Sequence, residues 1–147
     1  MTDIEIFQQI TSSANYQKTK NFRQHGIYSV YEHSIYVCQT ALKLSDFLHL
    51  KINRNSLTKA ALLHDYFLYD WHDKESPKLH GFRHAKIAAD NAKRDYGLTK
   101  KEYRIIASHM FPLGWRIPTS KEAILLTLAD KYCATRESFR RKAKTKK

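Results

Sequence analysis

Four polar residues occupy positions where the hydrophobic pattern of this chain points inward. His33 lies on the apolar stripe of one predicted helix, His64 lies on that of a second, and Asp65 follows His64 directly. Asp130 ends the apolar run 125–129. Because a buried imidazole or carboxylate without a partner is costly, these residues need hydrogen-bond partners or a shared cation. Imidazole and carboxylate together suit Zn, Fe, Mn, Co or Ni better than Ca. Their positions alone leave a metal site and a set of hydrogen-bonded core residues as alternatives.

Helices must hold these residues, and capping boxes with apolar periodicity predict where the helices begin and end. Three capping boxes each pair a hydroxyl with a carboxylate three residues later, which marks a helix start; they are Ser29–Glu32, Thr99–Glu102 and Thr119–Glu122. Gly97 is a natural helix end. The expected helices are 29–50, 57–68, 80–96, one that begins at 99, one that begins at 119, and a short leading helix within 3–17.

The composition favours one all-α domain. A chain of 147 residues fits a single domain, and 42% hydrophobic residues with only 4 Gly and 3 Pro are typical of a helix-rich globular protein. We find no internal repeat and no alternating strand pattern, so we expect a compact bundle of about six helices. Segment 123–134 is apolar almost all round and is expected to be its central buried helix. Residues 1–137 should form the domain, and residues 138–147 a basic tail that reads as a solvated helix end.

The net charge indicates the kind of partner. A formal charge of +12 favours anions such as phosphorylated small molecules, above all nucleotides, with nucleic acid as a less favoured partner. No apolar run is long enough to span a membrane and the first ten residues do not resemble a signal peptide, so we expect a cytoplasmic protein without a membrane partner. Cys38 and Cys133 lack metal or disulfide spacing and are expected to be reduced core residues.

Three segments of the chain resemble a known signature. These segments are similar to the H…HD…D motifs of the HD superfamily of metal-dependent phosphohydrolases, and they read YEHSIYVCQTA, KAALLHDYFLYDW and ILLTLADKYCA. The resemblance covers about residues 22–137. It implies a helical fold of the HD type. It also implies a first metal ion held by the four inward residues, His33, His64, Asp65 and Asp130. A second doublet, His72-Asp73, follows Tyr69-Asp70-Trp71 in an expected loop and not an apolar helix, so we reject it as the main site.

Two further histidines extend the resemblance to a site for two ions. Some branches of the superfamily, including dinucleoside polyphosphate hydrolases and cyclic dinucleotide phosphodiesterases, have two added histidine ligands between the doublet and the last aspartate. His80 in LHGFRHA and His109 in IIASHMFPL resemble them. His84 lies one turn after His80 on the same helix face, so either could be the ligand. We favour His80 as the ligand and expect His84 to face the substrate. Histidines at an exposed helix end are the alternative for His80 and His84.

The resemblance implies hydrolysis of a phosphoester or phosphoanhydride, with a nucleotide or dinucleotide as the expected substrate. One or two divalent transition-metal ions would activate a water molecule for attack on phosphorus. Asp65, as a ligand of both ions, would orient that water, and His25 would donate a proton to the leaving group. The cations expected to neutralise charge on the phosphate are Arg23, Arg83 and Lys131.

Two other functions fit parts of the pattern. Inositol oxygenases resemble the same six-ligand arrangement and use it with iron, so an iron-dependent oxygenase is one alternative. The basic tail supports another, a non-enzymatic regulatory or nucleic-acid-binding module stabilised by metal. The chain is shorter than typical dinucleoside polyphosphate hydrolases and lacks the extra elements of the cyclic dinucleotide enzymes, which leaves its substrate open.

Overall fold

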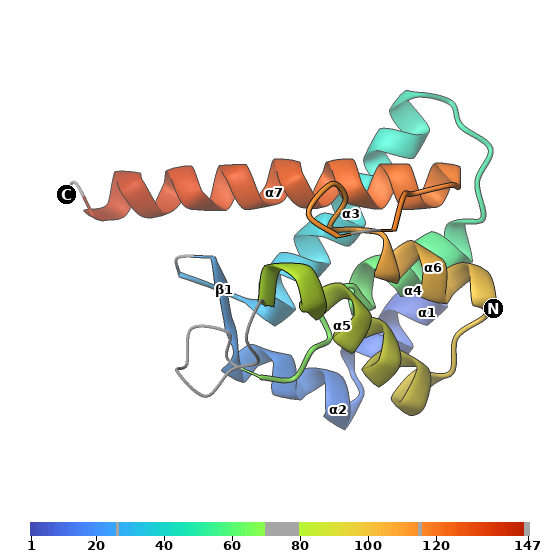
Figure 1. Cartoon of the computed structure of the whole chain (residues 1–147), viewed down its shortest axis with the longest axis horizontal. Coiled ribbons are helices and arrows are strands. Elements are labelled where there is room, and N and C mark those ends of the chain that lie inside the picture. Colours follow the sequence, from blue (N-terminus) through green and yellow to red (C-terminus); the bar gives the residue numbers. More distant parts are fainter. Residues whose placement is uncertain (26, 70–79, 115, 146–147) are drawn as a thin grey trace.

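The computed structural model describes residues 1–25, 27–69, 80–114 and 116–145, and it describes the backbone alone at residues 25, 80–82 and 141–145. Helices form the architecture, so the predicted all-α fold class is confirmed (Figure 1). The described part contains seven α-helices, slightly more than expected, one 3-10 helix and one small hairpin. In chain order they are α1 (Asp3–Thr11), α2 (Ala14–Gln17), η1 (Lys18–Asn21), β1 (Arg23–His25), β2 (Tyr28–Ser29), α3 (Val30–Phe47), α4 (Arg54–Leu63), α5 (His80–Tyr96), α6 (Lys100–Ala107) and α7 (Lys121–Thr145).

Helix α3 begins at the predicted capping box. The Oγ atom of Ser29 accepts a hydrogen bond from the backbone N–H of Glu32, and the Glu32 carboxylate accepts one from the backbone N–H of Ser29. The predicted inward stripe is buried from Val30 through Val37 to Ala41. Helix α3 packs on one side against α4 and on another against α7, which places His33 between them.

Helix α4 is shorter than its apolar pattern suggested. It ends at Leu63 and not at Leu68, because the chain turns at the His-Asp doublet and Leu68 adopts φ +60°, outside the right-handed helical region. The turn is closed by a hydrogen bond from the backbone N–H of Tyr66 to the Leu63 carbonyl. Tyr16, buried in the core, donates its hydroxyl to the Leu62 carbonyl at 2.7 Å and so satisfies a carbonyl in the last turn of α4.

Helix α5 follows the predicted boundaries, and α6 begins at the predicted capping box but ends at Ala107, before Met110, which was expected on its inner face. Helix α5 ends at Tyr96, and Gly97 takes the left-handed conformation at φ +67° that a residue with a side chain rarely adopts. The capping box from Thr99 to Glu102 is confirmed. Because α6 ends at Ala107, His109 lies in the turn that follows it.

The start of α7 differs from the predicted capping box. The side chain of Ser120, and not that of Thr119, accepts a hydrogen bond from a helix N–H, that of Ala123. Glu122 is therefore free for tertiary contacts, and its carboxylate accepts hydrogen bonds from the backbone of Asn53 and from Lys101. The predicted N-cap was one residue too early, because the neighbouring residues Thr119 and Ser120 can both cap a helix.

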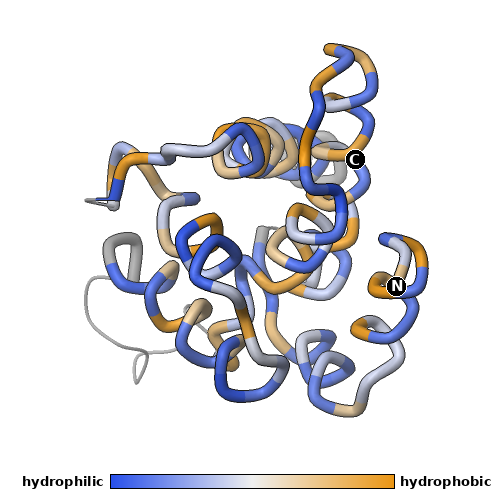
Figure 2. The backbone as a smooth tube through the Cα atoms, turned by 90° about the vertical axis from the view of Figure 1, so that its right-hand side faces the viewer, coloured by the Kyte–Doolittle hydropathy of each residue, from blue (hydrophilic) through white to orange (hydrophobic). Residues whose placement is uncertain are grey.

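The expectation that α7 is the central helix was wrong. It runs along one edge of the bundle, and its C-terminal part extends beyond the other helices (Figure 1). Figure 2 is turned by 90° and looks along this helix. Ile124, Leu128 and Tyr132, spaced four residues apart, are 48%, 52% and 56% exposed. Only the opposite face, with Leu125, Leu126 and Asp130 among its members, is buried. The basic segment after residue 137 continues this helix as far as Thr145.

A short hairpin precedes α3 and was not predicted. Strands β1 and β2 pair antiparallel, with a register irregularity between Arg23 and His25. Two strands of three and two residues are too short to show an alternating pattern in a sequence. The hairpin packs against α3 and α7, and its residue Gln24 is buried.

Two simpler expectations concern cysteines and membrane spans. Cys38 and Cys133 are buried and unbridged, as expected. Among the helices of the described ranges, none combines the length and the apolar character that crossing a bilayer requires.

Candidate metal centre

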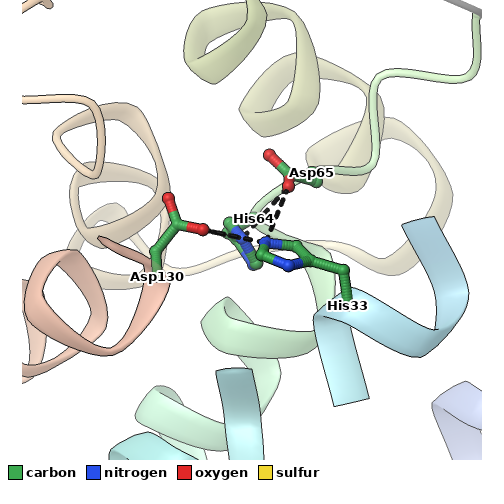
Figure 3. A group of neighbouring side chains, drawn as sticks. All are labelled: His33, His64, Asp65 and Asp130. Carbon is green, nitrogen blue, oxygen red and sulfur yellow. Dashed lines mark hydrogen bonds and ion pairs between the residues drawn. The ribbon is translucent and has the colours of Figure 1, made fainter. Parts of the chain in front are cut away.

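Four of the predicted ligands meet at the junction of α3, α4 and α7 (Figure 3). Nε2 of His33 lies 2.8 Å from Oδ1 of Asp130 and 3.4 Å from Oδ2 of Asp65. Nε2 of His64 lies 3.3 Å from the same Asp130 oxygen and 3.2 Å from the same Asp65 oxygen. One donor atom from each residue therefore faces a common point, and all four atoms lie within 4.8 Å of one another. We call these four residues cluster A.

A second group of donors lies on the other side of Asp65. Nε2 of His84, from α5, is 3.0 Å from Nε2 of His109, in the turn after α6. Both nitrogens face Oδ1 of Asp65, at 3.4 Å and 3.5 Å. We call Asp65, His84 and His109 cluster B. Since cluster A contains Oδ2 and cluster B contains Oδ1 of the same carboxylate, Asp65 joins the two clusters.

The two carboxylate oxygens of Asp65 differ in their hydrogen bonding. Gln24 donates its side-chain N–H to Oδ2 at 2.6 Å, which fixes the orientation of the group. Oδ1 is buried and accepts no hydrogen bond from any described residue, although Nε2 of His84 and Nε2 of His109 lie 3.4 Å and 3.5 Å away. A buried carboxylate oxygen in this state is costly, and a bound cation would compensate it.

Hydrogen bonds at Nδ1 fix the imidazole rings of three histidines. His64 and His109 each donate Nδ1–H to a backbone carbonyl three residues earlier, those of Ala61 and Ile106, at 2.6 Å. In both rings Nε2 is then the nitrogen that carries a lone pair in the neutral form, and in both it points into a cluster. Helix geometry thus prepares these imidazoles to bind a metal through Nε2.

The third histidine is held by a residue that the sequence analysis missed. Nδ1 of His33 donates to the carboxylate of Glu137, with its two oxygens 2.8 Å and 3.0 Å away. Glu137 is 4% exposed and lies two helical turns after Asp130 on the same face of α7. A carboxylate behind a metal-binding histidine is a common supporting arrangement. The signal was the seven-residue spacing from Asp130, but the charged segment RESFRRKAKTKK that contains Glu137 concealed it.

The charges of cluster A stabilise protonated imidazoles. Burial would lower the pKa of His33, but its hydrogen bonds with the carboxylates of Asp130 and Glu137 raise it to about 9. Burial would also lower the pKa of His64, but the charges of Asp65 and Asp130 raise it well above its usual value. Protons therefore bind where a metal ion would bind, and the two compete.

The pKa values of Asp65, Asp130 and His109 are lowered. Burial would raise the pKa values of Asp65 and Asp130, but the nearby His64 holds both well below their usual range. Burial lowers the pKa of His109, although Asp65 opposes this effect. At neutral pH both carboxylates are therefore ionised and His109 is a neutral imidazole, the forms in which these groups bind metals.

The donor set fits a divalent transition-metal ion. Cluster A offers two imidazole nitrogens and two carboxylate oxygens, and cluster B offers two nitrogens and one oxygen. Such mixed sets are typical of Zn, Fe, Mn, Co and Ni sites. These buried groups could therefore bind a divalent metal ion.

The structure brings most of the predicted site residues together. His33, His64, Asp65, Asp130 and His109 all lie in the two clusters. His84, which we expected to face the substrate, takes part in cluster B, in the position that we had expected His80 to fill. The side chains of His80 and His25, and the rejected doublet at 72–73, lie outside the described residues.

Three predicted cations make no direct contact with the clusters among the described residues. Arg23, Arg83 and Lys131 are exposed, and in the described part of the chain no hydrogen bond or ion pair joins them to either cluster. In β1 the residue that contacts Asp65 is Gln24, the neighbour of Arg23. The neutral side chain of Gln24, between Arg23 and His25, is the one that was not predicted; it is buried and contacts the site.

The comparisons with known proteins agree with this geometry. The family model described as HD domain matches residues 30–135, more than half of the chain. No curated protein matches, and no solved structure matches. The matched segment extends from the start of α3 into α7 and includes every residue of clusters A and B. This chain therefore belongs to the HD domain family.

Proposed function

We propose that this protein is a metal-dependent phosphohydrolase that cleaves a phosphoester or phosphoanhydride bond of a nucleotide or dinucleotide. The observation that carries the proposal is Asp65, one buried carboxylate with an oxygen in each of two histidine-containing clusters. Paired metal sites that share a carboxylate are suited to phosphoryl transfer because they can act on the attacking and the leaving oxygen together. The formal charge of +12 supports an anionic substrate.

Each cluster has a defined task in this proposal. His33, His64 and Asp130 would hold one divalent ion, His84 and His109 would hold another, and Asp65 would bind both. When bound, such ions lower the pKa of a water molecule and polarise phosphoryl oxygens. Gln24 would keep the Asp65 carboxylate in one orientation through the 2.6 Å hydrogen bond, so that the two sites keep a fixed separation.

The burial of the clusters suggests the side from which substrate approaches. His33, His64 and His109 are completely buried, whereas Asp130 and His84 retain 8% and 5% exposure. The edge formed by these two residues is therefore where a phosphate would meet the site. Arg83 precedes His84 and Lys131 follows Asp130, so we propose these exposed cations, with Arg23, as partners for phosphate oxygens. His25 remains our candidate for the proton donor to the leaving group.

A hydrolysis screen tests the proposal. Purified protein is analysed for bound metal, loaded with Mn, Fe, Co or Ni, and incubated with nucleoside mono-, di- and triphosphates and dinucleoside polyphosphates. We expect phosphate or nucleotide release that EDTA abolishes and that Asp65→Asn lacks. A fully metal-loaded protein that hydrolyses none of these compounds contradicts the proposal. Oxygen consumption by the iron-loaded form would then support an oxygenase, and metal-dependent stability without turnover would support a non-enzymatic module.

A further inference from the structure

A hollow of about 350 Å³ lies between α3 and α7 beside the hairpin. We call it the tyrosine groove, because three tyrosines and three cations line much of it: Tyr28, Tyr36, Tyr132, Lys43, Arg136 and Arg140. Its size falls at the lower end of the range for small-molecule sites. None of the residues of clusters A and B lines it.

The tyrosine groove carries positive charge that the described protein does not neutralise. Lys43 and Arg136 are exposed and make no ion pair or hydrogen bond with any described residue. Arg140 donates to the Tyr28 hydroxyl at 3.0 Å, a contact with a neutral group. The one carboxylate of the lining, Glu137, is engaged by His33. Some cations elsewhere are neutralised by a carboxylate: Lys86 pairs with Asp90, and Lys101 pairs with Glu122.

The aromatic rings of the groove are partly open to solvent. Tyr36 is 43% exposed and Tyr132 is 56% exposed, which is a large apolar area to leave uncovered. Tyr28 is buried, packs edge-on against Tyr36 with ring centroids 6.0 Å apart, and so supports that ring from behind. Tyrosine faces of this kind can stack on a planar ligand, and guanidinium groups bind phosphate oxygens in pairs.

The tyrosine groove is separated from cluster A by one pair of side chains. Glu137 lines the groove and contacts Nδ1 of His33, whereas Nε2 of His33 points into cluster A on the other side of the ring. A ligand in the groove would thus lie behind His33 and would not reach the donor atoms of either cluster. The groove is therefore distinct from both clusters.

We propose that the tyrosine groove binds a small phosphorylated aromatic molecule, with its phosphate on Lys43, Arg136 and Arg140 and its ring on Tyr36 or Tyr132. A simple inorganic anion would make no use of the tyrosines, and an uncharged aromatic compound would leave the cations without a partner. A second copy of this chain would bring two positive surfaces together. The volume suits one nucleotide and not a macromolecular chain.

Adenosine 5′-monophosphate is the probe for the test. Its binding is measured by calorimetry to the full chain, with wild-type protein in EDTA in one arm and Asp65→Asn in the other, so that metal-dependent binding at the clusters does not contribute. We expect one site per chain in both arms. Arg136→Gln combined with Lys43→Gln should weaken binding at least about 10-fold, because each lost charged hydrogen bond has an effect of that size. Tyr132→Ala should weaken it by a smaller factor.

The matched control is Lys121→Gln, which removes one exposed cation from the opposite end of α7, roughly 22 Å along the helix from Arg136. It should bind the probe like the parent protein. Binding that is unchanged in the double variant, or equal for inorganic phosphate and the nucleotide, would overturn the proposal. Tighter binding of a single-stranded oligonucleotide, unaffected by Tyr132→Ala, would overturn it in favour of a nucleic-acid surface. Because the altered side chains are exposed, melting temperatures should stay close to that of the parent protein.

Discussion

Clusters A and B share Asp65 but differ in what surrounds them. Cluster A has a second carboxylate, Asp130, and a supporting one, Glu137, behind His33. Cluster B has Asp65 as its single carboxylate among the described residues. Each negative ligand favours a divalent cation, so we expect cluster A to bind its ion more tightly than cluster B. The comparison suggests one permanent ion and a second that exchanges more readily.

The two clusters also differ in the protonation state of their histidines when no metal is bound. The carboxylates around cluster A raise the pKa of His33 to about 9, so this imidazole carries a proton at neutral pH. In cluster B the pKa of His109 is lowered by burial, so this ring is neutral. Metal binding at cluster A must therefore displace protons, whereas at His109 it need not.

The largest effect is expected from the residue that the clusters share. Asp65→Asn removes the charge that faces both sites while keeping the shape of the side chain. We expect both ions to be lost together and hydrolysis to fall at least about 100-fold, because the charges that bind and orient the metals disappear. His64→Ala should remove the ion of cluster A and abolish hydrolysis with it. Elemental analysis and initial rates measure both quantities.

Unequal losses from the two clusters would confirm their difference. His109→Ala should leave about one ion per chain, bound with nearly the parent affinity in cluster A, while hydrolysis falls on the order of 100-fold. His33→Ala should remove the tightly bound ion. Titration with Mn²⁺ followed by paramagnetic resonance counts the ions that remain. Equal losses in the two variants would mean that the two sites bind their ions as one unit and that cluster A does not bind its ion more tightly than cluster B.

Glu137 tests why cluster A is the stronger site. Glu137→Gln keeps a hydrogen-bond acceptor for Nδ1 of His33 but removes the negative charge. We expect the affinity of cluster A for Mn²⁺ to fall about 10-fold to 100-fold, the usual effect of losing such a supporting group. Ser138→Ala, at an exposed neighbouring position, is the control and should bind metal like the parent protein. An unchanged affinity in Glu137→Gln would show that the charge of Glu137 does not strengthen metal binding at cluster A.

Features that depend on local interactions could be predicted from the sequence. The capping boxes at Ser29 and Thr99 and the helix end at Gly97 are decided by residues within one turn, and all three were confirmed. The inward positions of His33 and His64 follow from helix periodicity in the same way. These predictions needed no knowledge of how the helices pack.

Features that depend on packing could not be predicted. Ile124 and Leu128 are as apolar as the buried leucines beside them, so the sequence could not show that their face of α7 is exposed. Gln24 lies in a hairpin too short to have a recognisable pattern, and its role depends on the distant Asp65. His80 and His84 share a helix face, and the placement of α5 against α6 is what brings His84 beside His109.

The smallest effect concerns pH and the protein without metal. The folded state raises the pKa of His33 to about 9 from an ordinary value near 6.5, and it raises that of His64 as well. Their protonation therefore stabilises the folded state fully below pH 6.5. The contribution of His33 is lost as the pH rises through about 9, and that of His64 is lost as the pH rises through its own raised pKa. Asp65 and Asp130, with lowered pKa values, stay ionised throughout this window and do not oppose the trend.

In EDTA the melting temperature should thus fall between pH 6.5 and 9, by a few degrees for a domain of this size. In excess Mn²⁺ the trend should disappear or reverse, because loss of the competing protons strengthens metal binding as the pH rises. His33→Gln, which cannot take up a proton, should show a flatter profile in EDTA than the parent. The lowered pKa of His109 acts in the other direction but only below about pH 6.5, so it does not contribute in this window. A melting temperature that rises with pH in EDTA would show that cluster A holds no stabilising proton, and the contrast between the clusters would then rest on ligand charge alone.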